Sequence, residues 1–304
     1  MLMIKNVNIP VIDSFTSFLT YQKRSSEHTV RSYLCDIFQF YDFLLTYDTG
    51  FKNIEEASYT AVRAWIVSLV ELKLQPRSIN RKLASLRSFY KFLCREGKIK
   101  ISPIAKVQPL KTKKTIPYFI EEDKMDALLS EIEFSDTFVG LRDRLIIELL
   151  YSTGIRLAEL LGLQHKDINL ADKTIKVLGK RNKERIVPIP ARLQKLIQSY
   201  ITLKQKEIPQ FGDERLIVTN TGKPAYPKLV YRVVKAYLQL VTTIDKKSPH
   251  VLRHTFATHL LNHGADLNAI KELLGHANLA ATQIYTHNSL EKLKNIFDQA
   301  HPKA

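Results

Sequence analysis

The segment from Gly97 to Pro117 divides this chain of 304 residues into two halves of different character. It contains two further prolines, which interrupt regular structure, and a basic run at 111–114. Such a stretch is typical of a linker, and each flanking half is long enough to bury a core of its own. We therefore expect a domain at 1–104, a basic linker at 105–118 and a second domain at 119–304.

The half before the linker carries only helical patterns. Apolar residues recur at helical spacing from Ile12 to Leu19 and again from Tyr33 to Leu44, and the second stretch follows a polar start at Ser26. A third helix fits the residues from Ser58 to Leu72, and Pro76 is suited to open a fourth. These patterns predict a helical bundle.

The half after the linker adds a small amount of β-structure. Helical patterns at 121–132 and 143–151, the latter running on into TGIRLAELLGL, are followed by short β segments and then by further helices. The β segments are 167–170, 174–178 and 185–189, and the later helices are 190–206, 226–241 and the stretch after Pro249. The turn GKRNKE at 179–184, flanked by β-branched residues, predicts a hairpin. The expected fold is mainly α with a small antiparallel β-sheet, and the C-terminal domain is α+β.

Charge favours a polyanionic partner. The chain has 46 basic and 30 acidic residues, a formal net charge of +16, and thirteen of the basic residues lie between Lys73 and Lys114 against the single acid Glu96. On a helix over 77–98, six of them fall within about 120° of one another, with only small or neutral polar residues between them. We expect this cationic ridge and the linker lysines to contact nucleic acid. The expected contacts are Arg77, Arg81, Arg87, Lys91, Arg95, Lys98, Lys111, Lys113 and Lys114.

The other broad classes fit less well. An anionic membrane surface is the weaker alternative, because the apolar side of the 77–98 helix resembles core and lacks flanking tryptophan. No run approaches the roughly 18–20 apolar residues that span a bilayer, and the N-terminus has no signal-peptide layout, so we expect a cytoplasmic protein. Cys35 and Cys94, the only cysteines, lie in separate helical patterns and are expected to be buried, reduced thiols.

Four polar side chains interrupt the apolar end of the chain: His250 and Arg253 in PHVLRHTFATHLL, and His276 and Tyr285 in LLGHANLAATQIYTH. Imidazole and guanidinium groups can hold and neutralise a phosphodiester, and a tyrosine can attack it. Taken alone, His276 could instead be a core or capping histidine, and Tyr285 could be an ordinary core aromatic. The four together favour phosphate chemistry.

A metal site is the competing interpretation of the histidines. His254, His259 and His263 join His250 in offering i to i+4 pairs on one helical face, as zinc sites do. A third ligand is not evident, however, and Arg253 would place a cation beside the metal. We therefore expect no metal site.

Four segments together resemble the catalytic boxes of the tyrosine recombinase (phage integrase) family in order and spacing. They are TGIRLAELLGL, VLGKRNKERIVPI, SPHVLRHTFATHLL and LLGHANLAATQIYTH. Within that family they resemble the bacterial Xer type, and the helical first half matches the family's core-binding (SAM-like) domain in kind. The resemblance implies DNA strand exchange through a covalent 3′-phosphotyrosine and a Holliday junction, without metal or nucleotide cofactor. For an Xer-type enzyme it also implies resolution of chromosome dimers at cell division.

The family's catalytic residues fall on six positions of this chain. They are Arg156, Lys180, His250, Arg253, His276 and Tyr285. The resemblance implies that the two arginines and His250 hold the phosphate, that Lys180 protonates the departing 5′-oxygen and that Tyr285 is the nucleophile. Arg156 could instead form only a structural pair with Glu159.

Three residues near Lys180 compete with it as the general acid. They are Arg181, Lys183 and Arg185, in the same hairpin. Glu159 is expected to support the site, and Asp143 to cap a helix or form a local pair.

The resemblance also implies partners. It implies double-stranded DNA with a specific recombination site, a homo- or hetero-tetramer with a second Xer-type recombinase, and a division-septum DNA translocase as a candidate activator. It further implies that the segment 290–297 packs into a neighbouring protomer, packing on its own domain being the simpler alternative. Rival functions are a mobile-element integrase or transposase, a type IB topoisomerase-like enzyme and a non-catalytic DNA-binding protein.

Overall fold

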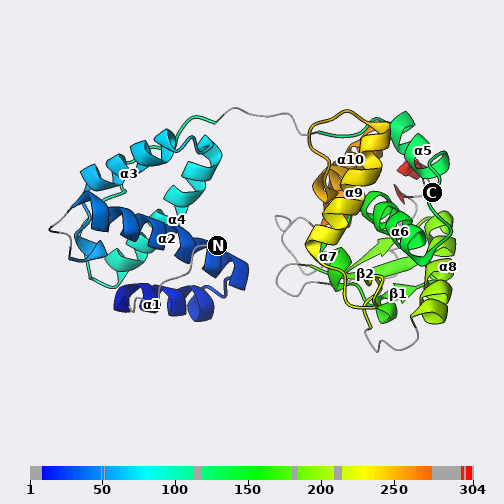
Figure 1. Cartoon of the computed structure of the whole chain (residues 1–304), viewed down its shortest axis with the longest axis horizontal. Coiled ribbons are helices and arrows are strands. Elements are labelled where there is room, and N and C mark those ends of the chain that lie inside the picture. Colours follow the sequence, from blue (N-terminus) through cyan, green and yellow to red (C-terminus); the bar gives the residue numbers. More distant parts are fainter. Residues whose placement is uncertain are drawn as a thin grey trace. The chain divides into compact units, whose positions relative to one another are not determined.

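The computed structural model describes residues 9–48, 50, 52–112, 118–179, 184–208, 214–275, 296–297 and 299–302. The chain separates into two compact units, Met1–Thr115 and Ile116–Ala304 (Figure 1). Each unit has a hydrophobic core of its own. Within the described residues, no helix combines the length and the hydropathy that crossing a bilayer requires.

The N-terminal unit is a helical bundle, as the sequence predicts. Ser26 and Ser58 cap the second and third main helices by accepting hydrogen bonds from the backbone N–H groups of Thr29 (3.3 Å) and Ala61 (3.1 Å), and Pro76 opens the fourth. The elements are α1 (Pro10–Ser17), the π-helical turn η1 (Phe18–Gln22), α2 (Glu27–Tyr47), the 3₁₀ turn η2 (Ile54–Glu56), α3 (Tyr59–Glu71) and α4 (Pro76–Arg95).

Helix α4 has the two faces that the sequence predicts. Its apolar face is buried in the core of the unit, where Phe89 packs edge-on against Phe15 with ring centroids 5.3 Å apart. The chain after α4 continues along the same core. Val107 is buried, and the side-chain amide of Asn80 exchanges two 2.8 Å hydrogen bonds with the backbone of Leu110. The first part of the expected linker is therefore held against the N-terminal unit.

The C-terminal unit surrounds a three-stranded antiparallel sheet of order β1-β2-β3, in which Ile175 is paired with Val187. The predicted hairpin is confirmed as the β2–β3 pair, and its tip at 180–183 lies outside the described residues. The elements are α5 (Glu122–Ser130), α6 (Phe138–Thr153), α7 (Leu157–Gly162), η3 (His165–Asp167), β1 (Ile168–Asn169), β2 (Thr174–Leu178), β3 (Glu184–Pro188), α8 (Ala191–Glu207), α9 (Pro227–Val241), α10 (Pro249–Asn262) and α11 (Leu267–Leu274).

One helix prediction in this unit is wrong in its extent. Helix α6 begins before 143, after the N-cap Thr137, and it does not run on into TGIRLAELLGL. It stops at Gly154, whose left-handed backbone (φ 58°) ends the helix. Only glycine fits there, because a Cβ at this position would lie 2.4 Å from the ring of Phe256. The interruption places Arg156 at the N-terminus of a new helix, α7.

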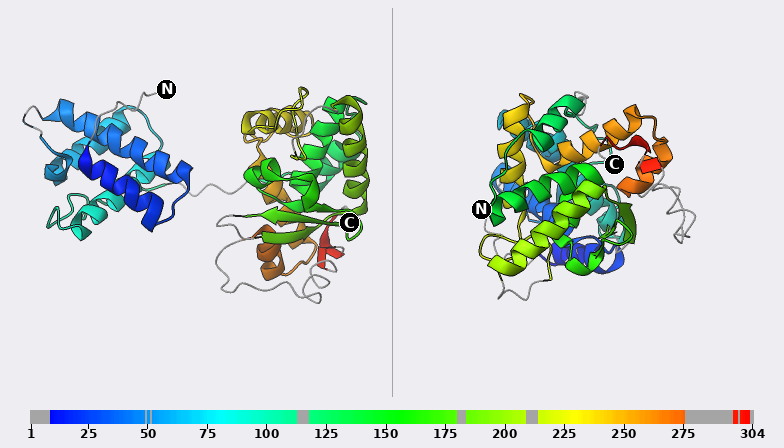
Figure 2. Two further views of the ribbon diagram at one scale, coloured as in Figure 1. Left: turned by 90° about the horizontal axis from the view of Figure 1, so that it is seen from below. Right: turned by 90° about the vertical axis from the view of Figure 1, so that its right-hand side faces the viewer.

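The end of the chain packs on its own unit. Phe297 is fully buried and lies in one cluster with Phe256 of α10 and Leu273 of α11. In the left view of Figure 2, α11 (orange) and the described C-terminal residues (red) lie on the side of the sheet opposite to the green helices. In the single chain, Ile296 and Phe297 thus pack on their own unit, and the implied packing of 290–297 into a neighbouring protomer stays a prediction. The rest of that segment lies outside the described residues.

The two cysteines are free thiols, as expected, but they are only half-buried. Cys35 lies on α2 and Cys94 near the end of α4. The expectation of full burial is wrong because both positions lie at the margin of the apolar faces rather than at their centre.

Candidate active site

Arg156 lies at the junction where α6 has ended and α7 begins. Its backbone N–H and its guanidinium both donate to Glu159, at 2.7 and 2.9 Å, so the ordinary structural pair is present. The same guanidinium also donates to the carbonyl of Gly275, at 3.1 Å. Its side chain is 35% exposed, so a bound phosphate can reach it.

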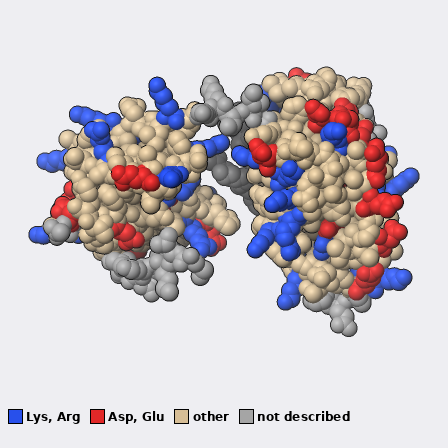
Figure 3. Space-filling view, turned by 45° about the horizontal axis from the view of Figure 1, so that its top comes forward, with Lys and Arg blue, Asp and Glu red and all other residues tan. Residues whose placement is uncertain are grey.

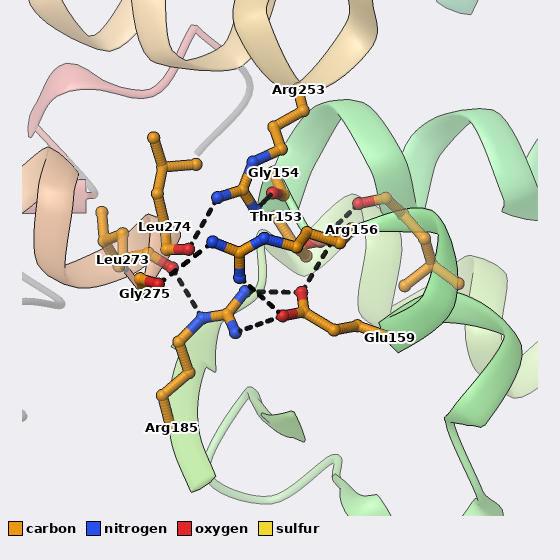
Figure 4. Close-up of polar contacts among 10 residues, drawn as sticks. Thr153, Gly154, Arg156, Glu159, Arg185, Arg253, Leu273, Leu274 and Gly275 are labelled. Carbon is orange, nitrogen blue, oxygen red and sulfur yellow. Dashed lines mark hydrogen bonds and ion pairs between the residues drawn. The ribbon is translucent and has the colours of Figure 1, made fainter. Parts of the chain in front are cut away.

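Arg253 approaches Arg156 from α10. It is 9% exposed and donates to the carbonyl of Gly154 and, at 2.7 Å, to that of Leu274 (Figure 4). A guanidinium has five N–H donors, and in the contacts with described residues Arg156 and Arg253 each use two. Both arginines are thus anchored to protein acceptors and still carry donors for a phosphate.

The guanidinium groups of three arginines donate hydrogen bonds to three consecutive backbone carbonyls at the C-terminus of α11. These carbonyls have no partner within the helix and carry partial negative charge, so cations are favoured there. The pairs are Arg185 with Leu273, Arg253 with Leu274 and Arg156 with Gly275. Gly275 has φ 64°, a backbone conformation that favours glycine, and a Cβ on it would lie 3.2 Å from the side chain of Arg185, which would have to shift slightly.

The site carries a surplus of positive charge. Burial lowers the pKa of Arg253 to about 10, and the charge of Arg156 acts in the same direction, so Arg253 remains a cation at neutral pH. Burial would raise the pKa of Glu159, but the hydrogen bonds and charges of Arg185 and Arg156 together hold it at about 2. Three arginines therefore face one ionised carboxylate, and the surplus favours an anion.

The depressed pKa of Glu159 predicts a pH-dependent contribution to stability. The value in the folded state, about 2, lies below the ordinary 4.5, so the contribution is present above about pH 4.5 and is lost as the pH falls through about 2. We expect the difference in free energy of unfolding between the wild type and Glu159→Gln to shrink across this window, measured by denaturant unfolding at a series of pH values.

Glu133→Gln is the matched control because Glu133 is exposed and forms no ion pair with a described residue. It should show no such pH dependence. A Glu159→Gln difference that stays constant down to the pH of acid unfolding would contradict the assigned pairing.

The other expected catalytic residues are described only in part. His250 is exposed on α10, three residues before Arg253. Lys180, His276 and Tyr285 lie outside the described residues, as do two of the competitors of Lys180, Arg181 and Lys183.

Arg185, the third competitor, is described and has another role. Its side chain is 6% exposed and donates to both oxygens of Glu159 at 2.9 Å. An arginine that is buried and fully engaged in this way is poorly placed to protonate a leaving group. Asp143 pairs locally with Arg142 at 2.7 Å, as expected.

Two other histidines in and directly after α10, His259 and His263, have structural partners. The Nε2 of His259 donates to the carbonyl of Ile120 at 2.8 Å, so its Nδ1 accepts from the hydroxyl of Tyr151 at 3.0 Å. Burial lowers the pKa of His259, which keeps the ring neutral. His263 pairs with Glu122 at 3.0 Å. In the described parts of the chain, no three His, Cys, Asp or Glu side chains lie close enough together to hold a metal ion.

The cationic ridge of α4 is partly engaged in contacts within its own unit. Arg81 forms a two-bond ion pair with the buried Asp36 of α2, and Arg87 donates to the carbonyl of Val107 at 2.6 Å. Arg95 stacks on Phe18, 4.1 Å from the ring centroid, and pairs with Glu96. The residues that are exposed and have no ion pair with a described residue are Arg77, Lys91, Lys98 and Lys111. Lys113 and Lys114 lie outside the described residues.

A second basic face, on α9, is missing from the sequence predictions. This helix contains three cations and no acid, and its opposite side is buried in the core. Its exposed residues include Lys228, Tyr231, Arg232 and Lys235. In Figure 3 most lysines and arginines of the right-hand unit lie on the left part of its visible face, whereas most acids lie along its upper and right edge. The signal in the sequence was the absence of acids from an amphipathic helix.

Comparisons with known proteins cover both units. Residues 12–97 match the phage integrase N-terminal SAM-like domain, and residues 118–292 match the phage integrase family. The chain is 37% identical to tyrosine recombinase XerC of Chlorobaculum parvum, over 96% of this chain and 94% of that protein. It is 38% identical to tyrosine recombinase XerC of Thermodesulfovibrio yellowstonii, over 96% of both.

Solved structures share the fold at lower identity. The XerH site-specific recombinase bound to palindromic difH substrate, in a post-cleavage complex, matches 93% of this chain and 82% of its own with a TM-score of 0.70 and 20% identity. The Tn1549 transposon integrase in complex with transposon right end DNA matches 94% and 99% with a TM-score of 0.70 and 20% identity.

Proposed function

The chain belongs to the phage integrase family and is a tyrosine site-specific recombinase, an enzyme that breaks and rejoins DNA, and from this premise we propose which of its residues act and on which DNA. The observation that carries the proposal is the convergence of Arg156 and Arg253, from α7 and α10, on one anchored cluster with donors left for a phosphate. These two arginines and His250 grip the scissile phosphodiester.

The grip is a catalytic device because charge grows on the non-bridging oxygens as the phosphate is attacked. Donors that are fixed before the reaction stabilise this charge without reorganising, and each is commonly worth a few kcal/mol. Glu159 and the α11 carbonyls fix Arg156 and Arg253 in this sense, because they hold one part of each guanidinium in place.

The proposed chemistry exchanges one phosphodiester for another. The Oη of Tyr285 bonds to phosphorus while the bond from phosphorus to the 5′-oxygen breaks, which leaves a 3′-phosphotyrosine and a 5′-hydroxyl. A phenol has a pKa near 10, so cationic surroundings help Tyr285 to lose its proton. Lys180 protonates the departing oxygen, and His276 joins the phosphate-binding groups. Because bond energy is conserved in the ester, a 5′-hydroxyl from the partner strand can reverse the step without a nucleotide or a metal.

The proposed DNA contacts are the exposed cations Arg77, Lys91, Lys98 and Lys111, the linker lysines Lys113 and Lys114, and the basic face of α9. Arg81, Arg87 and Arg95 add their charge from anchored positions. Lysine and arginine contacts of this kind position the duplex, and groove contacts specify the site.

The cellular role that we propose is resolution of chromosome dimers at cell division, in the cytoplasm. Support comes from the sequence similarity, along nearly the whole chain, to relatives named XerC. The C-terminal segments GHANL and AHPKA also resemble that branch. Recombination would join two specific sites in a tetramer of this chain, or of this chain with a second Xer-type recombinase, and a division-septum DNA translocase is the candidate activator.

A two-site plasmid tests the activity. The DNA site is first selected as the duplex that the wild-type protein binds most tightly in a random-sequence library. One plasmid then carries two direct repeats of this site, and another carries a single copy. We expect deletion between the repeats and no relaxation of the one-site plasmid. Relaxation of the one-site plasmid without deletion would indicate a topoisomerase.

Deleting the gene tests the cellular role. Chromosome dimers arise by homologous recombination, so we expect the deletion to increase cells with unsegregated chromosomes and a second deletion that disables homologous recombination to suppress this defect. Normal segregation, with loss of excision of a mobile element, would favour the integrase alternative instead.

A further inference from the structure

Arg185 joins three segments around the candidate active site. It lies on β3, its Nε donates to the carbonyl of Leu273 at the end of α11 at 2.8 Å, and its two terminal nitrogens donate to Glu159 of α7. All three of its nitrogens are therefore engaged, and its side chain is only 6% exposed. A residue in this state does not reach a DNA phosphate, so any effect on catalysis is indirect.

The contact with Glu159 determines what that carboxylate can offer Arg156. Its Oε1 accepts from Arg185 Nη1 and from Arg156 Nη1, each at 2.9 Å. Its Oε2 accepts from Arg185 Nη2 at 2.9 Å and from the backbone N–H of Arg156 at 2.7 Å. The paired, two-bond position on the carboxylate, which is the strongest geometry for an arginine, is thus filled by Arg185.

Arg156 is consequently held by a single side-chain bond to Glu159. Its other terminal nitrogen is free to turn towards the carbonyl of Gly275, and part of the side chain stays exposed. Without Arg185, a carboxylate that is 5% exposed would have Arg156 as its remaining guanidinium partner in the described site. Leaving a buried charge half-paired is unfavourable, so Arg156 would move to the two-bond position.

We propose that Arg185 is a positioning residue for DNA cleavage: by occupying the two-bond face of Glu159, it keeps Arg156 from being captured there and leaves it directed to the scissile phosphate. This inference rests on the proposed role of Arg156. It also explains why a basic residue in the Lys180 hairpin is buried rather than presented to DNA.

A double-mutant cycle tests the mechanism. Formation of the covalent adduct is measured in single turnovers on a nicked duplex selected by the wild-type protein, and affinity for the unnicked duplex is measured in parallel. We expect Arg185→Gln to slow adduct formation roughly 100-fold, the effect of losing one transition-state donor. Affinity should fall less than about threefold, because many other phosphate contacts remain.

The second arm of the cycle removes the capturing charge. In Glu159→Gln the neutral amide no longer attracts Arg156 strongly, so adding Arg185→Gln should slow the reaction less than about fivefold further. Arg185→Lys, which keeps the charge but cannot bridge both oxygens, should lose most of the activity that Arg185→Gln loses. Additive losses in the cycle, or full activity of Arg185→Lys, would overturn the proposal.

Two controls separate positioning from folding and from the proposed function. Arg192→Gln removes an arginine that also pairs with a buried glutamate, Glu148, at 3.4 Å, and it should leave the rate unchanged. The rates of all variants are measured below their thermal unfolding transitions. If Arg185→Gln lost folded protein, DNA affinity and cleavage rate to the same extent, the residue would have a folding role and not a positioning role. No adduct from the wild type on its selected duplex would overturn the proposed function itself. A wild-type adduct matched by Arg185→Gln would overturn only the role of Arg185.

Discussion

Replacing Arg253 with alanine should slow DNA cleavage by roughly 1000-fold, because a single fixed donor to the charge of the transition state is worth about 100- to 1000-fold and Arg253 offers several. Its two anchoring bonds, to the carbonyls of Gly154 and Leu274, determine where the remaining donors point. The rate to measure is that of covalent adduct formation in single turnovers on the selected nicked duplex. Binding should change much less than cleavage, because most phosphate contacts lie elsewhere.

The alanine variant also leaves two backbone carbonyls without their partner, at a cost to stability of about 1–3 kcal/mol each. Arg253→Lys is therefore the necessary companion, because it keeps the charge. A lysine is a compact charge without the planar fork, so we expect it to lose roughly 100-fold in rate. Arg192→Lys, at an arginine whose partners Glu148 and Leu129 are not part of the candidate site, should cleave at the wild-type rate. Full activity in Arg253→Lys would show that the site does not need the guanidinium geometry.

The sequence predicts elements that depend on local pattern. The amphipathic spacing of α2 and α4 and the β-branched segments around the hairpin contain their own signals, and these two helices and the β2–β3 pair lie where expected. The resemblance identified Arg156 and Arg253 as site residues, and the fold brings them together although they are 97 residues apart in the chain.

Contacts between distant segments could not be predicted in the same way. The close approach of Phe256, a residue of another helix, to Gly154 leaves no room for a side chain there, whereas the sequence LAELLGL by itself favours continued helix. The cations of α4 look alike in a sequence, yet Arg81 finds its partner Asp36 on α2 and is anchored there. A charge pattern defines a face and does not say which of its members have internal partners.

The role of Arg185 shows the same limit most clearly. In the sequence it is one of several basic residues around a hairpin turn and one of three local competitors of Lys180. The fold buries it because Glu159 from α7 and the end of α11 both approach β3. Burial of an arginine requires paired acceptors, and these acceptors come from two segments that no local pattern connects.

Replacing Tyr285 with phenylalanine should abolish the covalent adduct altogether, because the change removes the attacking oxygen and little else. We expect the variant to bind the selected duplex with an affinity near that of the wild type and to leave a nicked duplex uncleaved. Another tyrosine of the same unit, Tyr118, is exposed and lies outside the proposed DNA contacts, and Tyr118→Phe is the matched control that should still form the adduct. If Tyr285→Phe formed as much adduct as the wild type, Tyr285 would not be the nucleophile.

The central claim is that the protein links itself to DNA through Tyr285 and a 3′-phosphate. The most direct measurement is to denature the reaction with the nicked duplex, digest the adduct with a protease and a nuclease, and locate the attached nucleotide by mass spectrometry. We predict one modified peptide, containing Tyr285 and carrying a nucleotide through its 3′-phosphate. A nucleotide attached to another residue, a 5′-phosphate linkage, or cleaved DNA with no attached peptide would contradict the claim.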